Sequence, residues 1–187
     1  REHVVHGNGT ITRHHYDPVT FRLAQIRTTR AGYDPAFPDH RSGLRDDNVL
    51  QQLHYTYDAV GNITRVCDDA LRPVFFNNEK VYPESQYTYD SLYRLIHASG
   101  RESANPSAPA PGRQASATDK SFPVTDTTLR RYDQHYSYDS VGNILEMAHR
   151  TDSGTWTRTY DHAPDSNRLL STSTGSGSPL NYDYDDH

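Results

Sequence analysis

The sequence predicts an all-β protein in which consecutive antiparallel β-hairpins form a curved sheet. Its composition and a repeated motif both lead to this prediction. Hydrophobic residues make up only 33% of the chain, and the mean hydropathy is -0.91, values that by themselves would suggest disorder. The 14 tyrosines argue against disorder, because tyrosine buries a large ring, keeps a polar tip and favours strands. The apolar material therefore suits a thin β-structure better than a thick core.

The motif occurs in three segments that align without gaps, at residues 55–66, 87–98 and 136–147. Each begins Tyr-x-Tyr-Asp and continues into a hydrophobic return strand, and looser copies lie at 16–26, 160–170 and 182–187. A motif repeated in this way indicates a repeat architecture. The motif residues are Tyr55, Tyr57, Asp58, Gly61, Asn62, Tyr87, Tyr89, Asp90, Tyr136, Tyr138, Asp139, Gly142 and Asn143.

Each copy is typical of a β-hairpin. Tyrosines at i and i+2 place both rings on one face of a strand, and the aspartate ends that strand by accepting hydrogen bonds from backbone N–H groups further on. Gly61 and Gly142 can supply the positive φ of a short hairpin loop, and the following Asn also tolerates it. In the first return strand we expect Ile63 and Arg65 to share a face. Tyr93 stands where the other copies have Gly, so we expect its turn to differ.

Organisation between the copies is less regular. We treat 1–187 as one repeat segment that carries an insertion at 103–128, rich in Pro, Ala and Ser and typical of a surface loop. A further hairpin is predicted from 74–76 and 80–82, around the Asn-rich turn 77–79. The best helix candidate is short, around 46–52, because no segment keeps a 3.6-residue apolar period for long.

Charge and hydropathy disfavour two classes of function. The net charge of -5 provides no basic field for phosphates, so nucleic-acid binding is not expected. The longest apolar runs are a few residues, far below the roughly 20 that a membrane span requires. The sequence does not start with Met, and its last motif copy stops at His187. We therefore expect a piece of a longer protein whose strand edges pair with further repeats.

Residues that could carry chemistry have simpler structural interpretations. The 11 histidines are scattered, and His14 and His15 should point to opposite faces of a strand. An aspartate repeated in every hairpin serves the fold, since catalysis needs one site. We interpret Cys67 as a small buried hydrophobe and Trp156 as a packed ring. The acidic pairs at 46–47 and 68–69 are interpreted as turn and strand-end residues. We expect no catalytic residue, metal or cofactor.

The motif residues resemble the RHS/YD-repeat family, whose units read Tyr-x-Tyr-Asp-x-x-Gly-(Asn/Arg)-(Leu/Ile). The runs 55–69, 75–78 and 87–102 extend the likeness to RHS proteins of bacterial insecticidal toxin complexes, especially the C-component. In that family the repeats coil into a hollow cocoon around a toxic C-terminal segment, which a downstream core domain releases by autoproteolysis.

The resemblance implies a wall segment of a toxin-encapsulating shell, secreted or at the cell surface as part of a toxin complex, with no cleavage residues of its own. The implied partners are the remaining repeats of the parent shell and an enclosed toxin polypeptide. One alternative is a carbohydrate-binding cell-surface module that binds glycans, suggested by the dense Tyr and Trp156. A weaker alternative is a hydrolase with a carboxylate pair.

Overall fold

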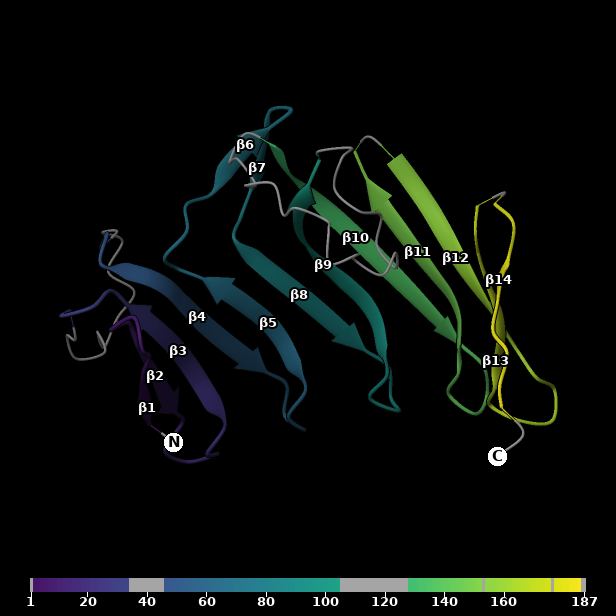
Figure 1. The fold of residues 1–187 in the computed structure, drawn as a ribbon, viewed down its shortest axis with the longest axis horizontal. Helices are drawn as coiled ribbons and strands as arrows, with labels where there is room; N and C mark the ends of the chain where they lie inside the picture. The colour runs from purple at the N-terminus through teal and green to yellow at the C-terminus, as the bar shows by residue number, and fades with distance from the viewer. Residues whose placement is uncertain (1, 34–45, 105–127, 153, 176, 186–187) are drawn as a thin grey trace. The chain divides into compact units, whose positions relative to one another are not determined.

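The computed structural model describes residues 2–33, 46–104, 128–152, 154–175 and 177–185. Within these ranges the chain forms fourteen β-strands and no α-helix, so the predicted all-β class is confirmed. Figure 1 shows the strands as a succession of hairpins. The chain divides into two compact units, Arg1–Gln86 and Tyr87–His187.

The first unit is an antiparallel sheet whose strands pair in the order β1-β2-β3-β4-β5-β8. Beside it, two short strands form a separate antiparallel ladder. The strand bounds are β1 His3–Val5, β2 Ile11–Tyr16, β3 Leu23–Thr29, β4 Val49–Tyr57, β5 Ile63–Asp68, β6 Val74–Phe76, β7 Glu79–Val81 and β8 Glu84–Tyr89. The boundary between the units falls inside β8, between Gln86 and Tyr87.

The second unit continues the same pattern. Its strands from β9 to β14 pair antiparallel with their neighbours in chain order. Their bounds are β9 Leu95–Ser103, β10 Leu129–Tyr138, β11 Ile144–Thr151, β12 Gly154–His162, β13 Leu169–Thr174 and β14 Leu180–Asn181. A consecutive antiparallel order is what short hairpin connections produce.

A β-bulge recurs beside the turns of the hairpins. In β4–β5 the pairing runs Thr56↔Arg65 and then Tyr57↔Ile63, so no residue of β4 lies directly opposite Thr64. The same shift occurs beside Tyr16, Tyr138 and His162. Because of the bulge, Ile63 lies opposite Tyr57 whereas Arg65 lies opposite Thr56, so the expectation that these two return-strand residues share a face is wrong. A bulge also increases the local twist of the strands.

Few side chains are fully buried. The buried apolar residues among those described are Cys67, Val74, Val81, Ala98 and Ala148. The buried polar set is of similar size and comprises Gln25, Arg27, Thr29, Ser99, His149 and Thr172. Most tyrosine rings of the motif are half-buried. This pattern agrees with a thin β-structure in which tyrosine carries the apolar contacts.

Two minor expectations have opposite outcomes. The hairpin predicted around 77–79 is confirmed, since β6 and β7 pair and both Asn77 and Asn78 have positive φ, at 48° and 63°. The short helix around 46–52 is wrong, because β4 begins at Val49 and β-pairing with β3 overrides the weak helical pattern.

The predicted insertion at 103–128 overlaps the structure only at its ends. Ser103 closes β9, and the Ala104 N–H donates to the Thr128 carbonyl at 2.6 Å. Residues 105–127 lie outside the described part of the chain. Among the described residues, no helix has the length and apolar character that a membrane crossing requires.

Candidate assembly surface at the hairpin turns

A single carboxylate organises the turn between β4 and β5. Asp58 Oδ1 accepts hydrogen bonds from the N–H groups of Val60, Gly61 and Asn62 at 3.1, 2.7 and 2.8 Å. The Asn62 side-chain amide donates to Asp58 Oδ2 at 2.9 Å, and the Asp58 N–H donates to the Asn62 carbonyl at 3.0 Å. Both carboxylate oxygens therefore hold the loop closed.

The other two full copies repeat this arrangement. Asp139 Oδ1 accepts the N–H groups of Val141 and Asn143, and the Asn143 amide donates to Asp139 Oδ2 at 2.8 Å. Asp90 Oδ1 accepts the N–H groups of Leu92 and Arg94. Here the guanidinium of Arg94 takes the place of the asparagine amide, with Nε 2.7 Å from Asp90 Oδ2. These bonds agree with the turn-capping role expected from the sequence.

Hydrogen bonding keeps these aspartates ionised. Desolvation alone would raise the pKa of Asp58 and of Asp139, but the asparagine amide and the turn N–H groups more than offset it, so each pKa lies below 3.8. The Arg94 N–H and then its guanidinium lower the pKa of Asp90 against a smaller desolvation effect. A carboxylate that accepts several hydrogen bonds is stabilised in its charged form.

The residue two positions before the return strand has positive φ in all three turns. The φ angle is 114° at Gly61 and 100° at Gly142, as expected for glycine. Tyr93 also takes positive φ, at 61°, and its turn keeps the same closure, with the Asp90 N–H donating to the Arg94 carbonyl at 2.9 Å. The expectation that this turn would differ is therefore wrong. The bonds of Asp90 hold Tyr93 in a left-handed conformation.

The second tyrosine of the motif contacts the preceding hairpin. The Tyr57 hydroxyl donates to the Leu23 carbonyl at 2.8 Å. Tyr138 bonds the Leu95 carbonyl at 2.7 Å, and Tyr184 bonds the Leu169 carbonyl at 2.9 Å. Desolvation raises the pKa of Tyr57 and of Tyr138 above 10.0. In these hairpins the second tyrosine thus joins one hairpin to the one before it.

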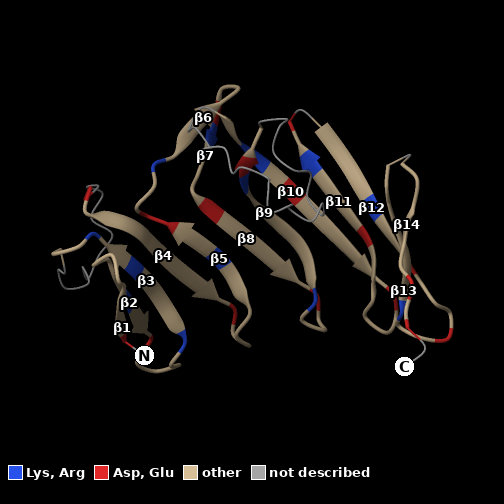
Figure 2. Ribbon diagram, viewed as in Figure 1, with Lys and Arg blue, Asp and Glu red and all other residues tan. Residues whose placement is uncertain are grey.

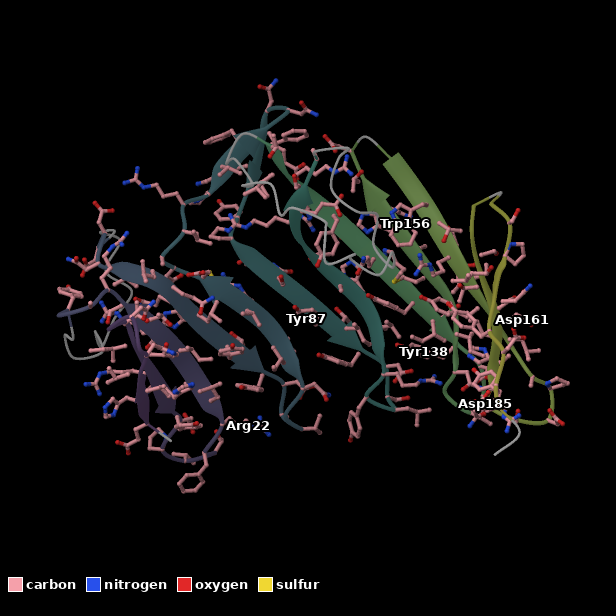
Figure 3. The ribbon with its side chains drawn as sticks, in the orientation of Figure 1. Arg22, Tyr87, Tyr138, Trp156, Asp161 and Asp185 are labelled. Carbon is pink, nitrogen blue, oxygen red and sulfur yellow. The ribbon has the colours of Figure 1, made fainter. Side chains whose placement is uncertain are left out.

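The first tyrosine of each pair has a different environment. Tyr55 lies opposite Val66, and Tyr136 lies opposite Met147. The Tyr136 hydroxyl donates to Gln134 Oε1 at 2.8 Å, and desolvation raises its pKa above 10.0. Tyr87 and Tyr89 occupy alternate positions on β8, and Figure 3 marks Tyr87 on that strand.

Arginine side chains accompany the tyrosine contacts, and sequence reasoning missed them. The Arg22 guanidinium lies 5.6 Å from the centre of the Tyr57 ring, and its Nη1 donates to the Asp58 carbonyl at 2.8 Å. Arg94 lies 4.8 Å from the Tyr138 ring and donates to the Asp139 carbonyl at 3.1 Å. Arg168 lies 5.4 Å from the Tyr184 ring. The available signal was the dipeptide Arg-Leu, which recurs at 22–23, 94–95 and 168–169.

The looser copy at 160–170 is placed differently from the sequence alignment. His162 lies opposite Leu169 beside a register shift, as Tyr57 lies opposite Ile63. The Ala163 N–H donates to the Arg168 carbonyl, which is the bond that Asp58 makes in its own turn. Tyr160 and Asp161 therefore lie two residues before the positions that we expected. Figure 3 marks Asp161 near the end of β12.

Trp156 is packed inside a polar network of the second unit. Its ring stacks on His149 at 4.9 Å between centroids, and Tyr132 lies 5.5 Å from the same imidazole. His149 has 2% of its surface exposed and lies 3.1 Å from both Glu102 Oε2 and Gln134 Nε2. The packed interpretation of Trp156 is confirmed, which leaves this ring a poor platform for stacking a sugar.

The remaining chemical candidates also have structural partners. Cys67 is 7% exposed, as expected for a small buried residue, and its thiol lies 3.2 Å from Asp69 Oδ1. Asp46 accepts the Asn48 N–H, and Asp68, which closes β5, accepts the N–H groups of Gln52 and Ala70.

Within the described ranges, no group of three or more His, Cys, Asp or Glu residues could hold a metal ion. His14 and His15 occupy successive positions on β2, opposite Ile26 and Gln25, so their rings point to opposite faces as expected. Figure 2 shows positive and negative residues interspersed along the strands and loops. The contacts described at the hairpin turns are tyrosine hydrogen bonds and arginine–tyrosine contacts between successive hairpins.

No protein-family model matches this chain. Two curated relatives from Yersinia entomophaga do match. The toxin subunit YenC1 is 43% identical over 144 residues, which are 77% of this chain and 13% of the relative. The toxin subunit YenC2 is 38% identical over 143 residues, 76% of this chain and 14% of the relative. The chain thus spans about one seventh of the length of these relatives.

Solved structures show the same fold over more of the chain. A TcdB2–TccC3 structure without its hypervariable C-terminal region has a TM-score of 0.66 at 36% identity and covers 90% of this chain. The Photorhabdus luminescens Tc holotoxin pore gives the same TM-score, identity and coverage. Each match takes in 7% of the longer chain. The chain is therefore an RHS/YD-repeat segment that resembles the shell of the C-component of bacterial insecticidal toxin complexes.

Proposed function

We propose that this chain is a wall segment of a toxin-encapsulating RHS shell and has no catalytic activity of its own. The observation that carries the proposal is the recurring contact between successive hairpins, in which a tyrosine hydroxyl bonds the leucine carbonyl of the hairpin before it. Such contacts extend a sheet from one hairpin to the next, which a wall requires. The likeness to toxin subunits supplies the context.

The partners proposed for the segment follow from this role. The remaining repeats of the parent protein continue the sheet, because isolated hairpins do not bury their faces. A toxin polypeptide occupies the space that the complete shell encloses. The assembly is secreted or lies at the cell surface as part of a toxin complex, in line with the toxin subunits that the chain resembles.

One observation favours a wall over an enzyme, and a second weighs against glycan binding. The recurring aspartates that could act as acids are occupied by turn N–H groups and by the side chains of Asn62, Arg94 and Asn143. The glycan-binding alternative gains no support, since the Trp156 ring stacks on His149. A glycan array probed with the 187-residue chain tests that alternative directly, and a reproducible hit would revive it.

The encapsulation role is tested in the longest natural open reading frame that contains this segment. We expect the region downstream of the repeats to resist added protease while the shell is intact. Replacing Tyr57 and Tyr138 together with alanine removes two hairpin contacts and should expose that region. A matched control replaces the exposed Leu92 of a turn tip with alanine. Digestion of that region in the parent protein as rapid as in the double variant would contradict encapsulation.

A further inference from the structure

His149 is a buried histidine of the second unit whose two ring nitrogens both face polar groups of other strands. Only 2% of its surface is exposed, and on β11 it lies between Gln134 of β10 and Trp156 of β12, its partners in the sheet. Its Nε2 lies 3.1 Å from Glu102 Oε2, and its Nδ1 lies 3.1 Å from Gln134 Nε2. Which nitrogen of such a ring carries a proton is set by what each nitrogen binds.

The carboxylate of Glu102 decides where the proton of the neutral ring lies. Glu102 forms an ion pair with Arg130, whose Nε donates to Glu102 Oε1 at 2.9 Å. A carboxylate in an ion pair only accepts hydrogen bonds, so His149 Nε2 must carry a hydrogen and donate it to Glu102. In a neutral imidazole the second nitrogen, Nδ1, is then an acceptor.

Gln134 presents the matching end of its side chain to this acceptor. Its Nε2 donates to His149 Nδ1, and its Oε1 accepts the Tyr136 hydroxyl at 2.8 Å. A chain of hydrogen bonds therefore runs from Tyr136 through Gln134 and His149 to Glu102, with every donor pointing in the same direction. This arrangement fits only the neutral form of the histidine.

We infer that Gln134 and His149 form a proton-operated switch, in which a proton taken up from water at His149 Nδ1 turns the Gln134 amide over. The charged ring has two N–H donors, so its Nδ1–H would face the Gln134 NH2 group, donor against donor. Rotating the amide by half a turn brings Oε1 to Nδ1–H and Nε2 to the Tyr136 hydroxyl, which also accepts. The two states differ in the direction of two hydrogen bonds, and both satisfy the histidine.

Charged and aromatic groups on the neighbouring strands act on the imidazolium. Glu102 of β9 attracts its positive charge, whereas Arg130 of β10 opposes it and binds the same carboxylate. Tyr132 of β10 and Trp156 of β12 stack on the ring at 5.5 and 4.9 Å between centroids, and aromatic faces attract a cation. Arg158 of β12, 6.0 Å from the centre of the Trp156 ring, adds a second positive charge. One carboxylate and two aromatic faces thus offset two cations, and the site can hold the charged ring.

The switch acts on a tyrosine of the repeat motif. In the neutral state the Tyr136 hydroxyl donates to Gln134 Oε1, and in the charged state the same hydroxyl accepts, so its hydrogen is released to another acceptor. Tyr136 and Gln134 occupy alternate positions of β10 and therefore share a face. Acid thus redirects a hydrogen bond inside the repeat while the β-pairing stays intact. The inference holds whether or not the parent protein encloses a toxin.

Nuclear magnetic resonance of the 15N-labelled 187-residue chain tests the inference without any substitution. At about pH 8 we expect an unprotonated His149 Nδ1 that shows scalar coupling across its hydrogen bond to Gln134 Nε2. On acidification to about pH 5, Nδ1 should gain a proton, the coupling should disappear, and the Gln134 NH2 signals should shift in the same step. A protonated Nδ1 at the start, unchanged Gln134 signals, or a ring that stays neutral throughout would each overturn the inference.

Fluorescence provides a second readout, because Trp156 is the one tryptophan of the chain. A stacked imidazolium quenches an indole more strongly than a neutral imidazole does, so emission should fall in one step as His149 gains its proton. Gln134→Leu removes the acceptor for Nδ1–H, and the step should move to lower pH by about one unit. A step that stays in place in Gln134→Leu would contradict the switch.

Two substitutions of the same kind assign the fluorescence step to one histidine. His149→Gln should abolish the step. His135→Gln replaces an exposed histidine on the opposite face of β10 and should leave the step unchanged. Loss of the step in His135→Gln, or its persistence in His149→Gln, would show that another group titrates.

Discussion

At the scale of single residues, the turn aspartates organise the hairpin turns by accepting hydrogen bonds. Asp58, Asp90 and Asp139 each use both carboxylate oxygens. Since several donors point at each carboxylate, the ionised form is the one that the folded chain binds best. The aspartates are therefore both structural groups and acid-sensitive ones.

This arrangement predicts an acid-labile fold. Folding lowers the pKa of Asp58, Asp90 and Asp139 below 3.8. A depressed folded-state pKa contributes stability above the unfolded pKa, and that stability is lost as pH falls through the folded value. We expect the urea midpoint to be flat from pH 7 to about 5 and to fall below about 4. The measurement is urea denaturation followed by far-UV circular dichroism across this range.

The control for the acid effect is Asp139→Asn. The amide keeps an acceptor oxygen for the Val141 and Asn143 N–H groups but does not titrate. The variant should be less stable at pH 7, and its midpoint should decline less between pH 5 and pH 3. A decline as steep as that of the parent chain would contradict the role of this carboxylate.

At the scale of the turn, Tyr93 stores strain that glycine would relieve. Its φ of 61° costs a bulky residue roughly 1–2 kcal/mol, while glycine adds unfolded-state entropy worth about 0.4–1 kcal/mol. Tyr93→Gly should therefore stabilise the chain by about 0.5 kcal/mol, measured by urea denaturation. Leu92→Gly, at an exposed neighbour without positive φ, should destabilise it. A loss of stability in Tyr93→Gly would mean that the ring makes compensating contacts.

The two motif glycines should respond unequally to alanine. A Cβ at Gly142 meets nothing within 4 Å, so Gly142→Ala costs only the strained φ of 100°, about 1 kcal/mol. A Cβ at Gly61 would lie 3.1 Å from Arg22 Nη2, so Gly61→Ala should cost more because it also displaces the guanidinium from Asp58. Both are measured as changes in the free energy of unfolding, and equal losses would argue that the Arg22 contact contributes nothing.

The turns could be predicted from sequence because their chemistry is local. Aspartate, glycine and the alternating tyrosines lie within a few residues of one another, as at 55–62. The prediction for the Tyr93 turn was wrong, because the hydrogen bonds that the Asp90 carboxylate accepts hold Tyr93 at a left-handed φ and outweigh its intrinsic steric preference. The copy at 160–170 was misplaced because Tyr160-Asp161 imitates the motif, and only the pairing of His162 with Leu169 fixes the register.

The contacts between hairpins could not be predicted in the same way. Arg22 and Tyr57 are brought together by the pairing of β3 with β4, and the length of chain between two hairpins does not reveal which strands are neighbours. The Arg-Leu dipeptide was visible in the sequence, but an arginine beside a turn is ordinarily a solvated side chain. Its role depends on the partner strand.

At the scale of the whole molecule, half-buried tyrosine rings supplement a small set of buried aliphatic residues, and the fold should be sensitive to alkali as well. Desolvation raises the pKa of Tyr57, Tyr132, Tyr136 and Tyr138 above 10.0. A raised folded-state pKa contributes stability below the unfolded pKa, and that stability is lost as pH rises through the folded value. We expect part of the 14 tyrosines to ionise, by absorbance at about 295 nm, only as the β-sheet signal disappears above pH 10.

The denatured chain is the reference for this titration. In guanidinium chloride all tyrosines should ionise together near pH 10. A native titration curve that coincides with the denatured curve would show that the rings are solvated and do not sustain the fold.

The tyrosine-to-leucine bond joins residues at very different distances along the chain. It links Leu23 to Tyr57 over 34 positions, Leu95 to Tyr138 over 43, and Leu169 to Tyr184 over 15. Closing a longer loop costs only about 0.6 kcal/mol for each doubling of its length. The chain between two paired hairpins is therefore a natural site for grafting. An epitope tag or a small folded domain placed there should leave the neighbouring strands in register, and length variation among natural relatives should concentrate at the same places.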